Sequence, residues 1–352
     1  MKILVIQQKM IGDVLTSSII CSNIKIIYPN CQVDYLVYPF TLPVLENNPD
    51  IDNIILFEEK YRKSKLAFLK FLLHLRKQKY NIVIDAYGKL ESNLVVAFSA
   101  AKIRIGFYKS YTSFIYTDTV KEISNPITNA GTAIENRLNL LSNLRNSIEL
   151  INKPKIFLTD QEIENGKAIL KKNNVDFSKK IYMISVLGSG ENKTYPFDYM
   201  ATLLDEIVRE TQSILLFNYM PNQEKEARKI FNLCSTETKA AINLNVVPTD
   251  IRSFLSILYH CDGLIGNEGG AINMAKAIIK PTFTIFSTWI IKEAWNSFEN
   301  ETSNISVHLK DFKPELYGDK SPKEMKNNAE NLYKSFLPQL ILPKLKVFLK
   351  KN

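Results

Sequence analysis

Three short segments of this chain combine residue types that could bind or act on a phosphorylated substrate. The first follows an apolar run at the start of the sequence and contains Gly12-Asp13, the second runs from Gly188 to Thr194, and the third contains Gly269-Gly270. A carboxylate placed just after a strand can accept a proton as a general base. Glycines and a lysine beside a helix start can bind a diphosphate.

The glycine pair lies between a predicted strand and a predicted helix. Asp262–Gly266 is short and apolar, Ala271–Ile279 has a helical pattern, and Thr282–Phe286 starts another strand. Two glycines at a helix start leave N–H groups accessible, and the helix dipole adds attraction for an anion. The alternative is an ordinary tight turn, since short glycine motifs often occur by chance.

The lysine segment, Gly188-Ser-Gly-Glu-Asn-Lys-Thr-Tyr-Pro196, follows a predicted strand at Ile181–Leu187. Its two glycines permit close approach of the backbone to a ligand, and Lys193 supplies a positive charge. Opposite the Gly269-Gly270 turn, this segment could bind a phosphate. The alternative is a solvent-exposed lysine in an ordinary loop.

Asp13 follows the first predicted strand and opens a predicted helix, Val14–Tyr28. In open α/β sheets, ligands bind at the carboxyl ends of the strands. A carboxylate there could deprotonate an attacking hydroxyl. The alternative is that Asp13 caps the helix, which is a common position for aspartate.

A basic segment lies between Lys60 and Lys79. It has eight Lys and Arg residues and no acid, and leucines recur in it at helical spacing. This pattern predicts a basic amphipathic helix that binds an anionic membrane surface or a phosphorylated acceptor. The alternative is a solvated surface helix. Nucleic acid is disfavoured because no aromatic and basic binding motif accompanies the charge.

The composition is that of a globular protein of two domains: 352 residues, 45% hydrophobic, 23% charged and a formal net charge of +9. The four cysteines form no C-x-x-C pair and no metal-like group with the three histidines. We therefore expect a reduced, cytoplasmic setting, no metal and no cofactor. No apolar run approaches the length that crosses a bilayer.

Strand-like and helix-like segments alternate along the chain, which predicts an α/β fold with parallel sheets. The linker-like stretch Asn152–Asp160 separates two series. We expect an N-terminal domain at 1–152, a second domain at 153–325 and a C-terminal helical segment at 326–352. The expected strands are Ile3–Ile6, Val33–Val37, Asn53–Phe57, Ile82–Asp85, Ile103–Gly106, Ile181–Leu187, Ser213–Phe217, Ala241–Leu244, Gly263–Ile265 and Thr282–Phe286.

A dinucleotide-binding dehydrogenase is disfavoured by the first turn of the chain. After the first strand, Gln7–Asp13 contains one glycine instead of G-x-G-x-x-G, and no Walker A loop is present.

Together, these motifs resemble the family 9 glycosyltransferases, the ADP-heptose:lipopolysaccharide heptosyltransferase group. Each motif is modest alone, but their joint order is specific and spans nearly the whole chain. The matching segments are Met1–Ile6 with Ile11–Val14, Lys79–Asp85, Arg104–Phe107, Glu135–Leu141, Lys193–Pro196 and Asn267–Thr282.

The resemblance implies a GT-B fold, with two Rossmann-like domains facing across a cleft. It also implies metal-independent, inverting sugar transfer from a nucleotide-diphosphate donor, such as an ADP-sugar, to lipopolysaccharide or another cell-envelope saccharide. The acceptor would be anionic and lipid-linked, and the enzyme would be cytoplasmic with peripheral contact to the inner membrane. Asp13 matches the catalytic base. The matching donor-binding residues are Gly188, Lys193, Thr194, Gln223 or Glu224, Glu268, Gly269, Gly270, Ala271 and Asn273; the matching acceptor-binding residues are Arg62, Lys63 and Lys65.

Three positions depart from the family pattern. Glu268 stands where aspartate is usual, Asn273 where histidine is usual, and Gln7 where arginine is common. These changes leave the transferase class intact but leave the donor sugar open, because the longer Glu268 and the missing histidine alter donor contacts.

Two other hypotheses about the function remain open from the sequence. A sugar-nucleotide epimerase of the same architecture would need no acceptor groove, so the basic segment argues against it. A noncatalytic glycan-binding or nucleotide-sugar-binding relative would need no base, so Gly12-Asp13 argues against that.

Overall fold

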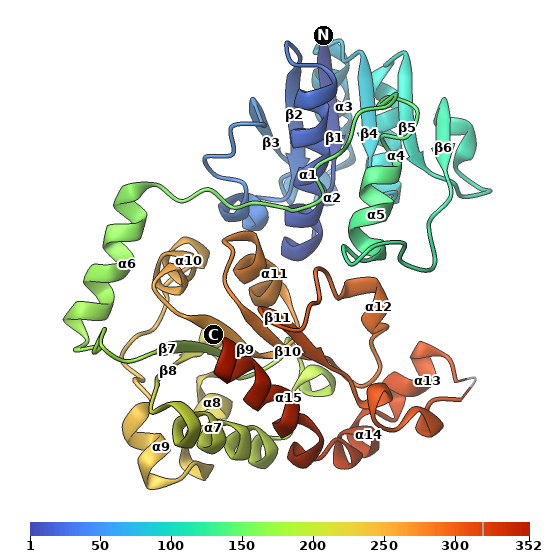
Figure 1. Cartoon of the computed structure of the whole chain (residues 1–352). Helices are drawn as coiled ribbons and strands as arrows, with labels where there is room; N and C mark the ends of the chain where they lie inside the picture. The colour runs from blue at the N-terminus through green and yellow to red at the C-terminus, as the bar shows by residue number, and fades with distance from the viewer. Residues whose placement is uncertain (319) are drawn as a thin grey trace. The chain divides into compact units, whose positions relative to one another are not determined.

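The structure is a computed structural model that describes residues 1–318 and 320–352. The chain divides into two compact units, Met1–Phe157 and Leu158–Asn352. Each unit contains one parallel sheet flanked by helices (Figure 1). No helix in the described part of the chain is long and apolar enough to cross a membrane.

The sheet of the first unit has the strand order β3-β2-β1-β4-β5-β6, and all pairs are parallel. This order reverses direction between β1 and β4, and such a switch point is where open α/β sheets bind ligands. The strands are β1 (Lys2–Ile6), β2 (Gln32–Val37), β3 (Asn53–Leu56), β4 (Ile82–Asp85), β5 (Ile103–Phe107) and β6 (Asp118–Val120).

Several helices contact each other in this unit. Helix α1 (Ile11–Ile27) contacts α5 (Thr132–Asn139), while α3 (Lys65–Lys77) contacts α4 (Leu90–Ser99). The inward residues of α3 and α4 join those of the sheet in one apolar core, to which Phe71, Leu75 and Val95 belong. The short elements are α2 (Lys60–Lys63), η1 (Pro39–Val44) and η2 (Ser113–Ile115).

The sheet of the second unit has the order β11-β10-β9-β7-β8 and is also entirely parallel. Its switch point lies between β7 and β9, so the segments that follow these two strands lie at the predicted ligand edge. The strands are β7 (Ile181–Ser185), β8 (Ile214–Asn218), β9 (Gly263–Asn267), β10 (Thr282–Ile285) and β11 (Asn304–Val307).

The C-terminal helices belong to the core of the second unit. Phe348 contacts the rings of Tyr182 on β7 and Phe283 on β10, and α15 lies beside α7 (Figure 1). The predicted C-terminal helical segment, 326–352, thus packs on the sheet of the second unit through Phe348. The helices of this unit are α6 (Asp160–Lys172), α7 (Phe197–Thr211), α8 (Glu224–Leu233), α9 (Thr236–Ala241), α10 (Ile251–Tyr259), α11 (Gly270–Ala277), α12 (Lys292–Trp295), α13 (Pro322–Asn327), α14 (Ala329–Ser335) and α15 (Pro338–Lys351), with η3 (Glu191–Lys193), η4 (Pro221–Gln223), η5 (Leu309–Asp311) and η6 (Pro314–Leu316).

A capping box marks the first helix after the boundary between the units. The Glu162 N–H donates to Thr159 Oγ1 at 3.2 Å, and the Thr159 N–H donates to Glu162 Oε2 at 2.8 Å. Arg252 on α10 holds the same carboxylate at 2.6 Å and lowers the pKa of Glu162 to about 2. These contacts fix the start of α6, which contacts α10.

The structure corrects the expected strands at three places. The prediction of a strand at Ala241–Leu244 is wrong, because this stretch forms only an isolated bridge between Ile242 and Leu215. Strands β6 and β11 were not expected from the sequence. Both are short edge strands, and neither is a continuous apolar run.

Candidate active-site residues

Asp13 lies in the first turn of α1, directly after the switch-point strand β1. The helix begins at Ile11 with Met10 as its N-cap, so Asp13 is the third helical residue and not the N-cap itself, although its side chain completes a capping box with the Met10 N–H. Asp13 Oδ2 has only a long contact, 3.5 Å, from the Met10 N–H. The carboxylate thus lies at the ligand edge of the first sheet.

Arg137 on α5 orients the Asp13 carboxylate. Its Nη2 lies 2.7 Å from Asp13 Oδ1, and both side chains are largely buried. The guanidinium also donates to Ser17 Oγ at 3.2 Å and to the Ala133 carbonyl at 3.0 Å. Arginine presents a planar set of donors, so these three contacts fix its orientation. One carboxylate oxygen is therefore held while Oδ2 remains available.

The residues before Arg137 hold α5 in place. Glu135 accepts hydrogen bonds from the N–H groups of Ile127 and Thr128, and Asn136 exchanges two hydrogen bonds with the backbone of Ile123. The motif Glu135–Leu141 thus contains two residues that fix a loop and one that reaches the candidate base. Arg137 belongs to this motif but was not predicted as a site residue from the sequence.

The predicted acceptor residues differ in their surroundings. Arg62 Nε lies 3.6 Å from Glu91 Oε1, whereas Lys63 forms a fully exposed pair with Glu59 at 2.8 Å. Lys65 is exposed at the first residue of α3. The acid-free segment is therefore partly neutralised by carboxylates outside it.

Tyr87 follows β4 and is partly buried. Burial raises the pKa of Tyr87 to about 12, and the charges of Glu91 and Asp13 add to that rise, while Arg62 opposes it. The charges of Glu91, Asp13 and Arg62 thus act on the Tyr87 hydroxyl in addition to its burial. Tyr87 is a residue that sequence reasoning missed, because nothing in its local sequence indicates these neighbours.

Lys193 in the second unit lies between an acid and an aromatic ring. Its Nζ is 3.2 Å from Glu268 Oε1 and 5.5 Å from the centroid of the Trp289 ring. Ser287 Oγ donates to the same Glu268 oxygen at 3.0 Å. The structure thereby brings together the lysine segment after β7, the acid after β9 and the tryptophan after β10.

The predicted glycine Gly188 is required by the packing of this loop. A Cβ at this position would lie 2.1 Å from the Lys193 carbonyl oxygen. The Gly188 N–H donates to Thr194 Oγ1 at 3.1 Å, and that hydroxyl donates to the Gly190 carbonyl at 2.9 Å. Thr194 therefore shapes the loop with its hydroxyl.

The sequence left open whether Gln223 or Glu224 contacts the donor, and the two residues have different environments. Gln223 Nε2 donates to the Gly188 carbonyl at 2.8 Å, so Gln223 adjoins the lysine loop. Glu224 begins α8 and pairs with Arg228 at 2.8 Å. Gln223 is the one that the structure brings to the site.

Asn267 joins the two segments at the second switch point. Its Oδ1 accepts the Tyr195 N–H at 2.8 Å, and its Nδ2 donates to the Ser185 and Val186 carbonyls at 3.0 Å each. The side chain is fully buried. Tyr195 is buried as well, and its hydroxyl donates to the Phe336 carbonyl at 2.6 Å. The lysine loop is thus fixed from both sides.

The glycine turn opens toward free space. Gly269 has a φ of +154°, and a Cβ on Gly269 or Gly270 would meet no atom within 4 Å. Helix α11 starts at Gly270, and Ala271 and Asn273 lie in its first turns. The first N–H groups of a helix have no partner within it and attract anions. This turn therefore has room for a group that Lys193 could also reach.

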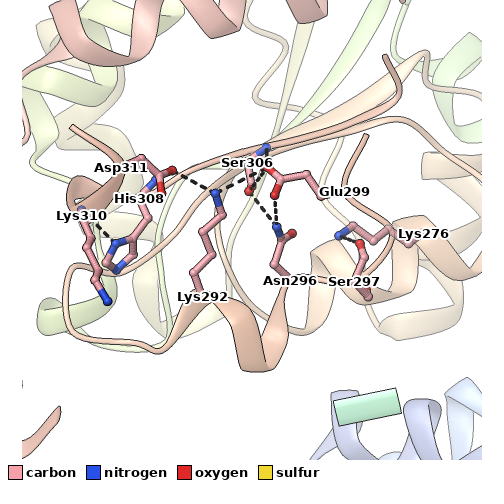
Figure 2. A network of polar contacts seen from close by, with 9 residues as sticks. All are labelled: Lys276, Lys292, Asn296, Ser297, Glu299, Ser306, His308, Lys310 and Asp311. Carbon is pink, nitrogen blue, oxygen red and sulfur yellow. Dashed lines mark hydrogen bonds and ion pairs between the residues drawn. The ribbon is translucent and has the colours of Figure 1, made fainter. Parts of the chain in front are cut away.

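The segment after β10 is held by a polar network (Figure 2). Lys292 Nζ lies 2.9 Å from Asp311 Oδ2 and 3.5 Å from Glu299 Oε1. Asn296 Nδ2 donates to Glu299 Oε2 at 2.6 Å and to Ser306 Oγ at 3.0 Å. These contacts fix α12 against β11 and η5.

Lys276 joins this segment to the helix that begins at the glycine turn. Its Nζ donates to the Ser297 carbonyl at 2.6 Å (Figure 2). Burial lowers the pKa of Lys276 to about 8. The segment after α12 is therefore attached to α11 at Ser297. Among residues 1–318 and 320–352, no group of His, Cys, Asp and Glu side chains is arranged to hold a metal ion.

The packing of Gly188 gives a test of the loop. Gly188→Ala should lower the free energy of unfolding by about 1–3 kcal/mol, because the new methyl group overlaps the Lys193 carbonyl. Gly190→Ala is the matched control, since its nearest atom is a side-chain oxygen at 3.9 Å. Thermal unfolding of both variants measures the difference, and equal stability of the two would contradict the described packing.

Comparison with known proteins agrees with this arrangement. The model of "Glycosyltransferase family 9 (heptosyltransferase)" matches residues 68–323. Lipopolysaccharide heptosyltransferase 1 of Campylobacter coli is 26% identical over 293 residues, which cover 81% of this chain and 84% of that protein.

Two solved structures show the same fold. The glycosyl transferase family 9 protein from Veillonella parvula has a TM-score of 0.73 at 14% identity, over 94% of this chain and 97% of that one. The E. coli heptosyltransferase WaaC with ADP-2-deoxy-2-fluoro heptose has a TM-score of 0.62 at 15% identity, over 87% and 93%. The predicted α/β fold of GT-B type is confirmed. Since the family model matches more than half of the sequence, this chain is a glycosyltransferase that belongs to family 9.

Proposed function

We propose that this enzyme transfers a sugar from an ADP-sugar to an anionic, lipid-linked saccharide of the cell envelope, of the lipopolysaccharide class. One observation carries the proposal: each parallel sheet has its predicted reactive residues at its own switch point, Asp13 in the first and Lys193 with Gly269 in the second. The names of the relatives support the donor and acceptor classes.

The proposal assigns the acceptor to the first unit, 1–157, and the donor to the second, 158–352. Asp13 Oδ2 takes the proton of the attacking acceptor hydroxyl, while Arg137 holds Oδ1. The hydroxyl oxygen then forms a bond to the anomeric carbon, and the bond from that carbon to the phosphate oxygen breaks. A single displacement of this kind inverts the configuration at the anomeric carbon.

The leaving nucleoside diphosphate needs positive partners, which we assign to Lys193 and to the N–H groups at the start of α11. Gly188, Thr194 and Gln223 hold the lysine loop in shape, and Glu268 holds Lys193 before the donor arrives. The mechanism uses no metal ion, so EDTA should leave turnover unchanged. We also propose that the enzyme works at the cytoplasmic side of the inner membrane, in peripheral contact with it.

The test of the whole proposal is release of ADP from an ADP-sugar in the presence and absence of an envelope saccharide. Release that depends on the acceptor, with an inverted anomeric configuration in the product by NMR, is the expected result. Conversion of the donor without any acceptor would contradict the proposal and favour an epimerase.

Asp13→Asn tests the base. The amide keeps the shape of the carboxylate but cannot accept the proton, so turnover should fall by about 10²–10⁴-fold while ADP affinity is unchanged. Asp160→Asn, in the first turn of α6, is the matched control and should retain full turnover. Wild-type turnover in Asp13→Asn would mean that the carboxylate serves only its ion pair with Arg137.

Lys193→Met tests the diphosphate site. Loss of a charged contact should weaken ADP binding by about 10- to 100-fold, measured by calorimetry. In the double variant Lys193→Met/Glu268→Gln, part of the affinity should return, because Glu268 no longer carries an unpaired charge. Lys326→Met is the control, since Lys326 also lies over the Trp289 ring, at 5.0 Å. Equal losses in both lysine variants would assign the effect to Trp289.

Arg62→Gln tests the acceptor side, where we propose that Arg62 and Lys65 bind acceptor anions and that Lys63 contributes less. The acceptor KM should rise by about tenfold in low salt and by less at physiological salt, where the Debye length is about 8 Å. Lys63→Gln is the matched comparison and should raise the acceptor KM by less, because Lys63 is already paired with Glu59. An unchanged acceptor KM in Arg62→Gln would mean that the basic segment is a solvated surface without a role in acceptor binding.

A further inference from the structure

Helix α3 exposes leucines on the face opposite its core side. Leu66, Leu69 and Leu73 are 63%, 43% and 46% exposed. They are three and four residues apart, so they form one line on the helix, the leucine ridge. The inward face carries Phe71, Leu72 and Leu75, which are buried in the core. The ridge is therefore additional to the residues that attach α3 to its sheet.

Four cations flank the leucine ridge on both sides. A helix turns by about 100° per residue, which places Lys65 and Arg76 on one side of the ridge and Lys70 and Lys77 on the other. Helix α3 has no Asp or Glu. Among the residues that the structure describes, none of these four side chains has a carboxylate within ion-pair distance.

Some exposed cations elsewhere in the chain pair with an acid of their own helix. Arg228 pairs with Glu224 on α8, and Lys334 pairs with Glu330 on α14, both four residues apart. This is the ordinary pattern of a solvated helix. Helix α3 has no acid of its own, and its four cations flank a line of exposed leucines.

We propose that α3 lies on an anionic phospholipid bilayer, with the leucine ridge in the interfacial region and the four cations on lipid phosphates. Amphipathic helices with a basic, apolar face bind membranes in this way. A second copy of this chain fits less well, because two such faces would bring like charges together. Nucleic acid would leave the leucines unused.

This inference rests on the proposed function, because a lipid-linked acceptor is presented at a membrane. It also has a geometric consequence for the acceptor residues. Helix α2, which carries Arg62, ends one residue before α3, and Ser64 caps α3 by accepting the Ala67 N–H at 3.2 Å. A bilayer beneath α3 would therefore hold Arg62 near the level of the lipid headgroups.

The test is co-sedimentation with vesicles that mix phosphatidylglycerol with phosphatidylethanolamine, compared with vesicles of phosphatidylcholine alone. The wild type should bind only the anionic vesicles. Leu66→Gln/Leu69→Gln/Leu73→Gln should lower the partition coefficient at least about tenfold, because each buried leucine contributes to interfacial binding. Lys70→Gln/Arg76→Gln/Lys77→Gln should lower it similarly, and more strongly in low salt.

Matched controls separate the ridge from apolar or basic surface in general. Leu233→Gln/Leu337→Gln removes two exposed leucines of the second unit, and Lys171→Gln/Lys172→Gln/Lys179→Gln removes three exposed lysines. Both controls should bind like the wild type. Leu69→Trp gives a second readout that needs no loss of binding: its emission should be quenched by brominated phosphatidylglycerol.

Wild-type vesicle binding by the triple leucine variant would overturn the inference. The same holds if the wild type does not bind anionic vesicles, or if the tryptophan emission of Leu69→Trp is not quenched. A wild-type dimer that the leucine substitutions convert to a monomer would assign the ridge to self-association instead. None of these readouts needs turnover. With a water-soluble, deacylated acceptor, the triple leucine variant should keep wild-type kcat, so a failure of the transferase proposal would be seen separately.

Discussion

The second unit depends on the fully buried side-chain amide of Asn267. A buried amide that lacks partners destabilises a fold, whereas one that uses both its oxygen and its nitrogen rigidifies it. Asn267 donates to two carbonyls at the end of β7 and accepts the N–H of Tyr195, so the strand that carries the glycine turn also fixes the lysine loop. The distance between Lys193 and Gly269 is thus set by core hydrogen bonds instead of by flexible surface loops.

Most of the fold could be predicted from the sequence, because its central strands are continuous apolar runs. The prediction for Ile82–Asp85 agrees with β4 at both ends. The edge strands could not be predicted: Asp118–Val120 and Asn304–Val307 mix polar with apolar residues and are recognisable only through their pairing with β5 and β10. The stretch around Ile242 gave the opposite error, a predicted strand that does not form. Its short apolar run makes a single bridge, from Ile242 to Leu215, without extending into a strand.

The candidate site was predictable where the chemistry is local in sequence. Asp13 and the Gly269-Gly270 turn follow directly from the strand-to-helix order, and both lie at switch points in the structure. Contacts between distant segments were not predictable. Arg137 reaches Asp13 across 124 residues, and Trp289 meets Lys193 only because β7, β9 and β10 are neighbours. These pairings depend on strand order, which no local pattern contains.

The position of Trp289 also gives the protein an internal optical reporter. The chain has two tryptophans, Trp289 and Trp295, so its indole emission arises from one short segment. The Trp289 ring lies near two ammonium groups, those of Lys193 at 5.5 Å and Lys326 at 5.0 Å. A cation over an indole face perturbs its π-electrons. An anion that draws Lys193 from the ring would therefore change the fluorescence of the unlabelled protein, and Trp295→Phe would leave Trp289 as the single source of that signal.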